Sequence, residues 1–121
     1  MTADTRIHDW DSYNAGLRDR GRELVGLHPE LMKGLGALNR GAATTRHLDA
    51  KTRELIALAV AVTTRCEGCI DDHARRAKAA GASKEEIAEA LGVAIALNAG
   101  AALTYSLHVL DAVDGAPPPK G

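Results

Sequence analysis

The side chains that could do covalent or proton-transfer chemistry gather in one stretch of this chain, residues 54–73. Both cysteines of the protein lie there, Cys66 and Cys69, at C-x-x-C spacing. His73 follows Cys69 by four residues, and Glu54 precedes Cys66 by twelve. Thiols, imidazoles and carboxylates attack electrophiles, transfer protons and bind metal ions. This stretch is therefore the candidate site, and the rest of the chain is expected to position it.

The cysteine pair could act as a redox centre. The thiolate is the nucleophilic form of cysteine, and an unperturbed thiol has a pKa of about 8.5. A C-x-x-C that opens a helix receives the positive end of the helix dipole, which lowers the pKa of the thiols. His73 could accept a thiol proton, and two cysteines three positions apart can close a disulfide. Acidic neighbours such as Asp71 and Asp72 would raise the thiol pKa if they faced the sulfurs. The spacing alone does not decide whether the thiol pKa is lowered or raised.

Other interpretations of the same residues remain open at this stage. The cysteines could be two small buried apolar residues, or they could form a four-ligand zinc site with His73 and Glu54. Structural zinc sites usually take two close pairs from separate segments, and this chain offers no second pair. The helical rise places Glu54 about 18 Å from Cys66 and His73 only about 10 Å from it. Spacing alone therefore predicts Glu54 as a surface or salt-bridge residue.

The hydrophobic periodicity predicts an all-α fold without strands. Six helices are expected, over residues 9–27, 29–40, 51–64, 66–80, 83–98 and 101–113. Asp49 and Ser83 are predicted N-caps, Gly81 is a predicted helix stop, and a bend is expected at residues 98–100. On the helix that contains the cysteines, one side is predicted to carry the site while three cationic residues point elsewhere: Arg75, Arg76 and Lys78. Residues 1–115 are predicted to form a single domain, and residues 116–121 a disordered tail.

Composition limits the partners of the protein. The 121 residues carry a net charge of −1 and include no Phe, one Trp and two Tyr. No basic run is interleaved with aromatic residues, so we expect no nucleic-acid binding. The longest unbroken apolar run, residues 55–62, is too short for a bilayer, and the N-terminus lacks a secretory pattern, so we expect a cytoplasmic protein without membrane attachment. A core made of small side chains buries little area per residue, which predicts added contacts between subunits.

The chain resembles the carboxymuconolactone decarboxylase and alkylhydroperoxidase D family over residues 28–113. The likeness rests on separated elements that match in order and spacing: Glu54, the Cys66–Cys69 pair, His73, and the segments 28–32, 48–56 and 81–87. It implies an all-helical fold with a central helical hairpin, the C-x-x-C opening its second helix, and assembly into homotrimers or homohexamers. It also implies a thiol-dependent peroxidase that needs no metal, haem or flavin.

The resemblance also assigns roles to the four site residues. Cys69 attacks a hydroperoxide, Cys66 resolves it as a disulfide, and His73 and Glu54 relay protons, which overrides the assignment of Glu54 from spacing. An unidentified dithiol or protein reductant would restore the thiols. One departure is Gly68, where alkylhydroperoxidases often carry a histidine. The alternatives are a lactone decarboxylase that uses His73 and Glu54 as acid and base, and a non-catalytic oligomeric or zinc-binding module.

Overall fold

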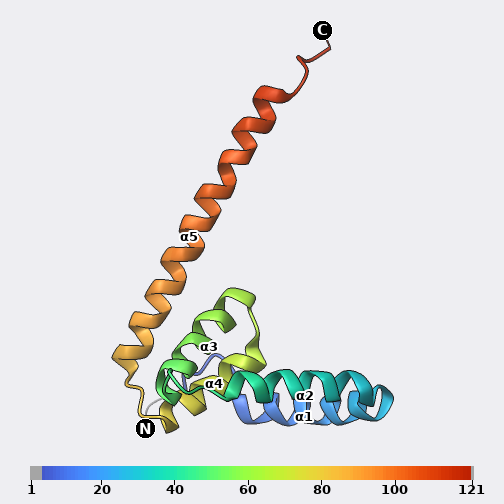
Figure 1. The fold of residues 1–121 in the computed structure, drawn as a ribbon, viewed down its shortest axis with the longest axis vertical. Helices are drawn as coiled ribbons and strands as arrows, with labels where there is room; N and C mark the ends of the chain where they lie inside the picture. The colour runs from blue at the N-terminus through green and yellow to red at the C-terminus, as the bar shows by residue number, and fades with distance from the viewer. Residues whose placement is uncertain (1–3, 121) are drawn as a thin grey trace.

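The computed structural model describes residues 4–120, which form helices without any strand (Figure 1). The described residues form five helices: α1 (Trp10–Leu27), α2 (Pro29–Ala43), α3 (Ala50–Thr64), α4 (Glu67–Ala79) and α5 (Lys84–Gly115). The all-α prediction is therefore confirmed. The predicted helix count of six is wrong, because one continuous helix replaces the last two.

The helices α3 and α4 form a hairpin at the centre of the fold. Helix α3 packs against both α4 and α5, whereas α1 packs against α2 and α4. Arg65 ends α3 in the left-handed conformation, with φ of 56°, and the chain then turns directly into α4. This short reversal places the end of α3 beside the start of α4.

Local capping signals define the helix ends where the sequence predicts them. The Asp49 carboxylate accepts a hydrogen bond from the Thr52 backbone N–H at 2.7 Å and begins α3. Ser83 and Glu86 form a reciprocal capping box at the start of α5. Gly81 adopts a φ of 89°, which L-residues disfavour, and separates α4 from α5. These caps confirm the predictions for Asp49, Ser83 and Gly81.

Helix α5 continues through the predicted bend at residues 98–100. The Asn98 side chain donates to the Ala94 carbonyl at 2.7 Å and to the Thr63 hydroxyl at 2.9 Å. The side chain is thereby held against α3 and leaves the helical backbone uninterrupted. Gly100 costs a helix interior only about 1 kcal/mol relative to alanine, which is too little to end a helix of this length.

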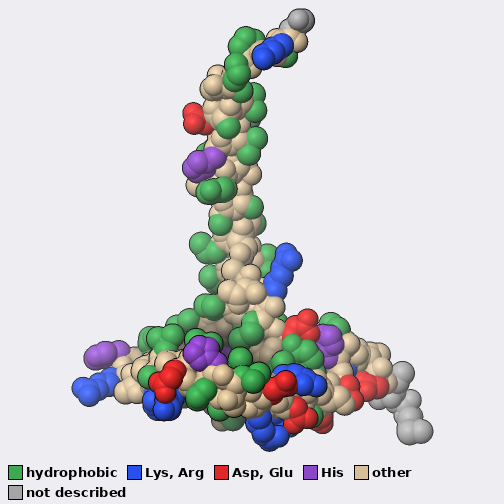
Figure 2. Space-filling view, turned by 90° about the vertical axis from the view of Figure 1, so that its right-hand side faces the viewer, with side chains coloured by type: hydrophobic (Ala, Val, Ile, Leu, Met, Phe, Trp, Pro, Cys, Tyr) green, Lys and Arg blue, Asp and Glu red, His purple; other side chains and the backbone are tan. Residues whose placement is uncertain are grey.

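The described chain buries only a small core. Its buried apolar residues are Leu58 and three alanines, one each on α3, α4 and α5: Ala61, Ala77 and Ala94. Figure 2 shows the distal part of α5 standing clear of the other helices, with hydrophobic side chains along its length. By length and composition alone, α5 could cross a membrane, although its charged and polar residues break it into short apolar runs.

Candidate functional site

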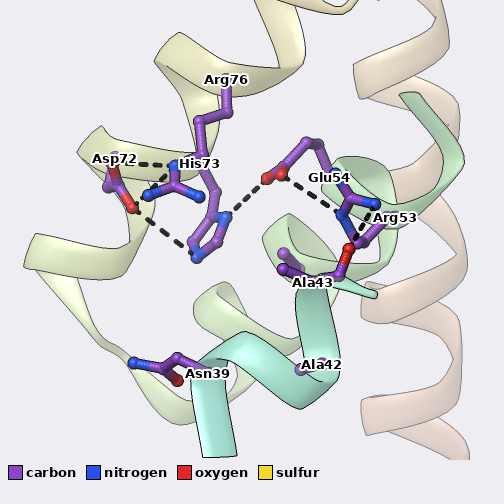
Figure 3. Close-up of a pocket in the computed structure, with 9 residues that line it drawn as sticks. Asn39, Ala42, Ala43, Arg53, Glu54, Asp72, His73 and Arg76 are labelled. Atoms are coloured by element: carbon purple, nitrogen blue, oxygen red, sulfur yellow. Dashed lines mark hydrogen bonds and ion pairs between the residues drawn. The ribbon is translucent and has the colours of Figure 1, made fainter. Parts of the chain in front are cut away.

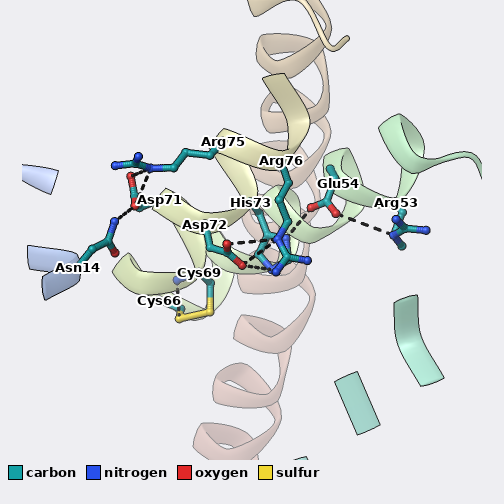
Figure 4. Close-up of polar contacts among 10 residues, drawn as sticks. All are labelled: Asn14, Arg53, Glu54, Cys66, Cys69, Asp71, Asp72, His73, Arg75 and Arg76. Atoms are coloured by element: carbon teal, nitrogen blue, oxygen red, sulfur yellow. Dashed lines mark hydrogen bonds and ion pairs between the residues drawn. A yellow bond between two sulfur atoms is a disulfide. The ribbon is translucent and has the colours of Figure 1, made fainter. Parts of the chain in front are cut away.

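The two cysteines lie at the turn between α3 and α4. Cys66 is the N-cap residue of α4, and its Sγ accepts a hydrogen bond from the Cys69 backbone N–H at 3.3 Å. The two sulfurs form a disulfide bond, with the Cα atoms 5.2 Å apart (Figure 4). Both residues are half-buried, so the pair lies near the surface rather than within the core. The pair occupies the helix N-terminus, where the backbone N–H groups favour negative charge on sulfur.

Glu54 of α3 and His73 of α4 meet in a direct contact. Glu54 Oε2 lies 2.6 Å from His73 Nδ1, and the glutamate is only 5% exposed. The spacing predicted a surface or salt-bridge residue; the surface alternative is therefore wrong, whereas the salt-bridge alternative agrees with this contact. Rise along a helix fixes positions on that helix alone, whereas the packing of α3 against α4 determines which residues meet. A buried carboxylate with an imidazole partner is a stable arrangement for proton transfer.

The contact with Glu54 fixes how His73 can act. A carboxylate accepts hydrogen bonds, so the proton of a neutral imidazole resides on Nδ1 and leaves Nε2 as the basic nitrogen. Asp72 Oδ2 lies 4.0 Å from Nε2. Among the hydrogen bonds of residues 4–120, none joins His73 to either sulfur. The imidazole is one helical turn from Cys69 along α4.

A cavity of about 290 Å³ opens beside the Glu54–His73 pair (Figure 3). Two guanidinium groups face it, those of Arg53 and Arg76. Arg53 is held by the Ala43 carbonyl at 3.2 Å and by the Thr45 hydroxyl at 2.8 Å. The remaining lining residues come from α2, α3 and α4: Asn39, Ala42, Ala43, Ala57 and Asp72. The cavity is thus lined by charged and polar side chains together with three alanines.

The two arginines of this cavity were not predicted from the sequence as site residues. Arg76 was expected to point away from the site, and that prediction is wrong. Arg76 follows His73 by three residues, so the two side chains lie on neighbouring positions of one helix face. Its Nε bonds the Asp72 carboxylate at 3.2 Å. Two features of the sequence could have indicated these arginines: Arg76 lies three residues after His73, and Arg53 directly precedes Glu54.

Helix α1 covers the cysteine turn from the other side. A Cβ atom at Gly68 would lie 2.8 Å from Leu17 Cδ1, so any larger residue requires the leucine side chain to move. His8 bonds Glu67 at 2.8 Å, and the Asn14 amide donates to Asp71. The close approach of α1 explains why a small residue fits between the two cysteines.

Asp71 anchors α1 to α4 as a carboxylate. Its side chain is buried and accepts hydrogen bonds from Asn14 and from Arg75, whose Nε lies 3.1 Å away. The Asn14 amide, with the Arg75 guanidinium adding to it, lowers the pKa of Asp71 against the opposing effect of burial. Asp71, one of the acidic residues that could have raised the thiol pKa, is therefore hydrogen-bonded to Asn14 of α1 and to Arg75.

No cluster of three or more histidine, cysteine or acidic side chains within residues 4–120 is arranged to hold a metal ion. His73 and Glu54 bond one another, and the cysteines bond one another. The four residues that the zinc alternative requires therefore form two separate pairs in this structure.

The carboxymuconolactone decarboxylase family model matches residues 29–112. The chain belongs to this family. Among similar proteins, an uncharacterised protein of Haemophilus influenzae is 55% identical over 104 residues, which cover 86% of this chain and 92% of that protein. A second uncharacterised protein, encoded in the cox locus of Paracoccus denitrificans, is 43% identical and covers 66% of this chain and 75% of its own length.

Two solved structures resemble this family member. A carboxymuconolactone decarboxylase family protein from Legionella pneumophila, in its apo form, is 35% identical and superposes with a TM-score of 0.64 over 84% of this chain and 90% of that one. A protein from Methanobacterium thermoautotrophicum is 28% identical, with a TM-score of 0.65 over 71% of this chain and 97% of that one. The family resemblance predicted from the sequence motifs is thus confirmed.

Proposed function

We propose that this family member is a thiol-dependent peroxidase of the alkylhydroperoxidase D type. The observation that carries the proposal is the contact between buried Glu54 and half-buried His73, one turn from a half-buried, disulfide-forming C-x-x-C. A neutral imidazole with a fixed tautomer is a general base for a thiol, and the adjacent sulfurs supply the redox couple.

The first half of the proposed cycle consumes the peroxide. His73 accepts the Cys69 proton through a bridging water, and Glu54 stabilises the imidazolium that forms. The Cys69 thiolate attacks the terminal oxygen of a hydroperoxide; the O–O bond breaks, and the alkoxide takes a proton to leave as an alcohol. Cys69 is now a sulfenic acid, oxidised by two electrons.

The second half restores the enzyme. The Cys66 thiolate attacks the Cys69 sulfur, and the S–O bond breaks as the hydroxyl group leaves with a proton as water. The product is the Cys66–Cys69 disulfide seen in this structure. A dithiol or a protein reductant then reduces the disulfide by thiol–disulfide exchange and is itself oxidised to a disulfide. Atoms and electrons balance over the cycle: one hydroperoxide and one dithiol yield one alcohol, one water and one disulfide.

The direct test is hydroperoxide consumption by Cys69→Ser in the presence of a dithiol reductant. The proposal requires that this variant lose enzymatic turnover, since no nucleophilic thiolate remains at that position. Cys66→Ser serves as the matched variant and should complete the first step but not the disulfide. A Cys69→Ser protein that consumes hydroperoxide as fast as the wild type would overturn the assignment.

The cavity favours a second candidate, a lactone decarboxylase in which His73 and Glu54 act as acid and base. The cavity lining includes this pair and two arginines that could bind the carboxylates of such a substrate. Neither Cys66 nor Cys69 is among the residues that line the cavity. Activity on 4-carboxymuconolactone that survives replacement of both cysteines by serine would support this candidate. Loss of hydroperoxide turnover in the same double variant would not distinguish the two, so the lactone assay decides.

A further inference from the structure

Two arginines lie at the boundary between two neighbouring hollows of the surface. Arg53 and Arg76 line the cavity of about 290 Å³ described above, which three alanines also line. The same arginines line a second hollow of about 420 Å³ between the start of α3 and the end of α4. Ligand pockets begin at about 300 Å³, so the cavity matches a small organic molecule. Its alanines suit an apolar stem, and its arginines suit a negatively charged group on that stem.

The guanidinium of Arg53 is held in place by uncharged acceptors. Its Nη1 donates to the Ala43 carbonyl at 3.2 Å and to the Thr45 hydroxyl at 2.8 Å. The nearest carboxylate in the described part of the chain is that of Glu54, and its Oε1 lies 3.9 Å from Arg53 Nε, too far for a hydrogen bond. Glu54 makes its short contact with His73 instead. Most of the positive charge of Arg53 is thus left to act on the cavity.

The guanidinium of Arg76 is only partly engaged. Its Nε bonds the Asp72 carboxylate at 3.2 Å, whereas its two terminal nitrogens, Nη1 and Nη2, have no hydrogen-bond partner among residues 4–120. The side chain is 59% exposed, so a ligand can reach it from solvent. The N–H groups of a guanidinium match the two oxygens of a carboxylate in spacing and in plane. Arg76 can therefore bind a carboxylate without giving up Asp72.

Arg76 lies on the same face of α4 as the proposed nucleophile. Cys69, His73 and Arg76 occupy positions i, i+4 and i+7 of this helix, which is the spacing of residues that share a face. The helical rise places Arg76 about 10 Å from Cys69 along the axis. Because Arg76 bonds Asp72, four residues earlier, its side chain leans back toward the cysteines. Figures 3 and 4 show its guanidinium beside the His73 imidazole, so one molecule can extend from the sulfur to the guanidinium.

The charge of the cavity changes during the proposed reaction. While His73 is neutral, the two arginines are balanced by the two carboxylates of the lining, Glu54 and Asp72. Once His73 has accepted the thiol proton, three cationic groups face these two carboxylates, which leaves one positive charge. A single carboxylate on the substrate would neutralise this charge at the moment the thiolate forms.

We propose that the substrate of this site is an organic hydroperoxide that carries a carboxylate, which Arg76 binds while Arg53 adds positive charge. The proposal rests on the peroxidase assignment and names the substrate class of the same site. The Cys69 thiolate takes the terminal oxygen, the O–O bond breaks, and the alkoxide takes the proton held by His73 and leaves as a hydroxy acid. The substrate carboxylate gains and loses no electrons. Arg76 thus determines specificity and takes no part in the bond changes.

The test compares two hydroperoxides that differ only in the charged group: 6-hydroperoxyhexanoate and its methyl ester. Their consumption is measured with excess dithiol for the wild type, Arg76→Gln and Lys78→Gln. Arg76→Gln keeps hydrogen-bond donors but removes the charge, and its exposed position means that the fold should persist. Lys78 is an exposed cation of the same helix that does not line the cavity, so Lys78→Gln is the matched control for loss of one positive charge. Circular dichroism checks the helix content of each variant.

The expected result is a wild type that prefers the acid over the ester by about five- to thirteenfold in kcat/KM, the difference between a charged and a neutral hydrogen bond. Arg76→Gln should lose this preference through a higher KM for the acid, with kcat/KM for the ester unchanged, because the lost contact is made equally before and during the reaction. Lys78→Gln should keep the preference.

Two outcomes would overturn this proposal and leave the peroxidase assignment in place. One is a wild type that consumes the acid and the ester with equal kcat/KM, which decides the question even without the variants. The other is an Arg76→Gln protein in which kcat/KM falls equally for both substrates, since the role of Arg76 would then be structural. A wild type that consumes neither hydroperoxide would remove the peroxidase assignment itself, and this proposal with it.

Discussion

Replacing Glu54 by glutamine perturbs the proposed relay while preserving its shape. The amide oxygen can still accept the hydrogen bond that Glu54 Oε2 accepts from His73 Nδ1 at 2.6 Å, so the imidazole keeps its position and tautomer. What the variant loses is the negative charge that stabilises the imidazolium during proton transfer. The perturbation therefore isolates charge from geometry.

The size of the effect follows from the kind of hydrogen bond that is lost. Bonds to charged groups contribute about 1.5–3 kcal/mol, against about 0.5–1.5 kcal/mol for neutral ones. The difference, about 1–1.5 kcal/mol, corresponds to a decrease in kcat/KM for hydroperoxide of about five- to thirteenfold. Glu54→Ala should lose more, because it also removes the bond and leaves space beside His73.

The assay is hydroperoxide consumption with excess dithiol, measured across pH for wild type, Glu54→Gln and Glu89→Gln. Glu89 is an exposed glutamate on α5 and controls for the loss of one carboxylate. We expect Glu89→Gln to match the wild type. A folded Glu54→Gln protein with unchanged kcat/KM at every pH would refute the relay, since the charge would then do nothing for the reaction.

Three further predictions concern the scaffold. Ser83→Ala removes the N-cap of α5 and should lower the free energy of unfolding by about 1 kcal/mol, measured by urea denaturation; no change would show that the cap is redundant. Leu58→Ala truncates the one large apolar side chain that is buried among residues 4–120 and should cost about 2–5 kcal/mol in the same assay; a smaller cost would mean that the surrounding side chains collapse into the space. The pKa of Asp71 is lower in the folded protein than its ordinary value of 3.8, so at acidic pH this carboxylate binds fewer protons in the folded state than in the unfolded state. Its contribution to stability is therefore present above pH 3.8 and is lost as the pH falls through the lower pKa of the folded state. Asp71→Asn should therefore flatten the acid limb of the thermal stability profile below about pH 5, and an unchanged acid limb would contradict this.

Local chemistry explains which parts of the fold could be predicted. Asp49, Ser83 and Gly81 satisfy or redirect backbone groups within three or four residues, so their effect is visible in the sequence. The prediction of a bend at residues 98–100 was wrong because the Asn98 side chain bonds Thr63, which lies 35 positions earlier and on another helix. A residue that usually interrupts a helix is here a contact between helices, and only the packing reveals it.

The site shows the same division between local and long-range information. Cys66 and Cys69 are neighbours in sequence, so their pairing was foreseeable as one outcome. The burial of Glu54 against His73 depends on how α3 packs on α4, which spacing along either helix does not specify. Family resemblance supplied that pairing, and the geometry agrees with it.

The most direct measurement of the central claim is the intact mass of reduced Cys66→Ser and Cys69→Ser after one equivalent of hydroperoxide. The account predicts that Cys66→Ser gains one oxygen atom, trapped as a sulfenic acid on Cys69, while Cys69→Ser stays unmodified over the same time. Oxidation of Cys66 in the Cys69→Ser protein at the same rate, or no oxidation in either variant, would contradict it.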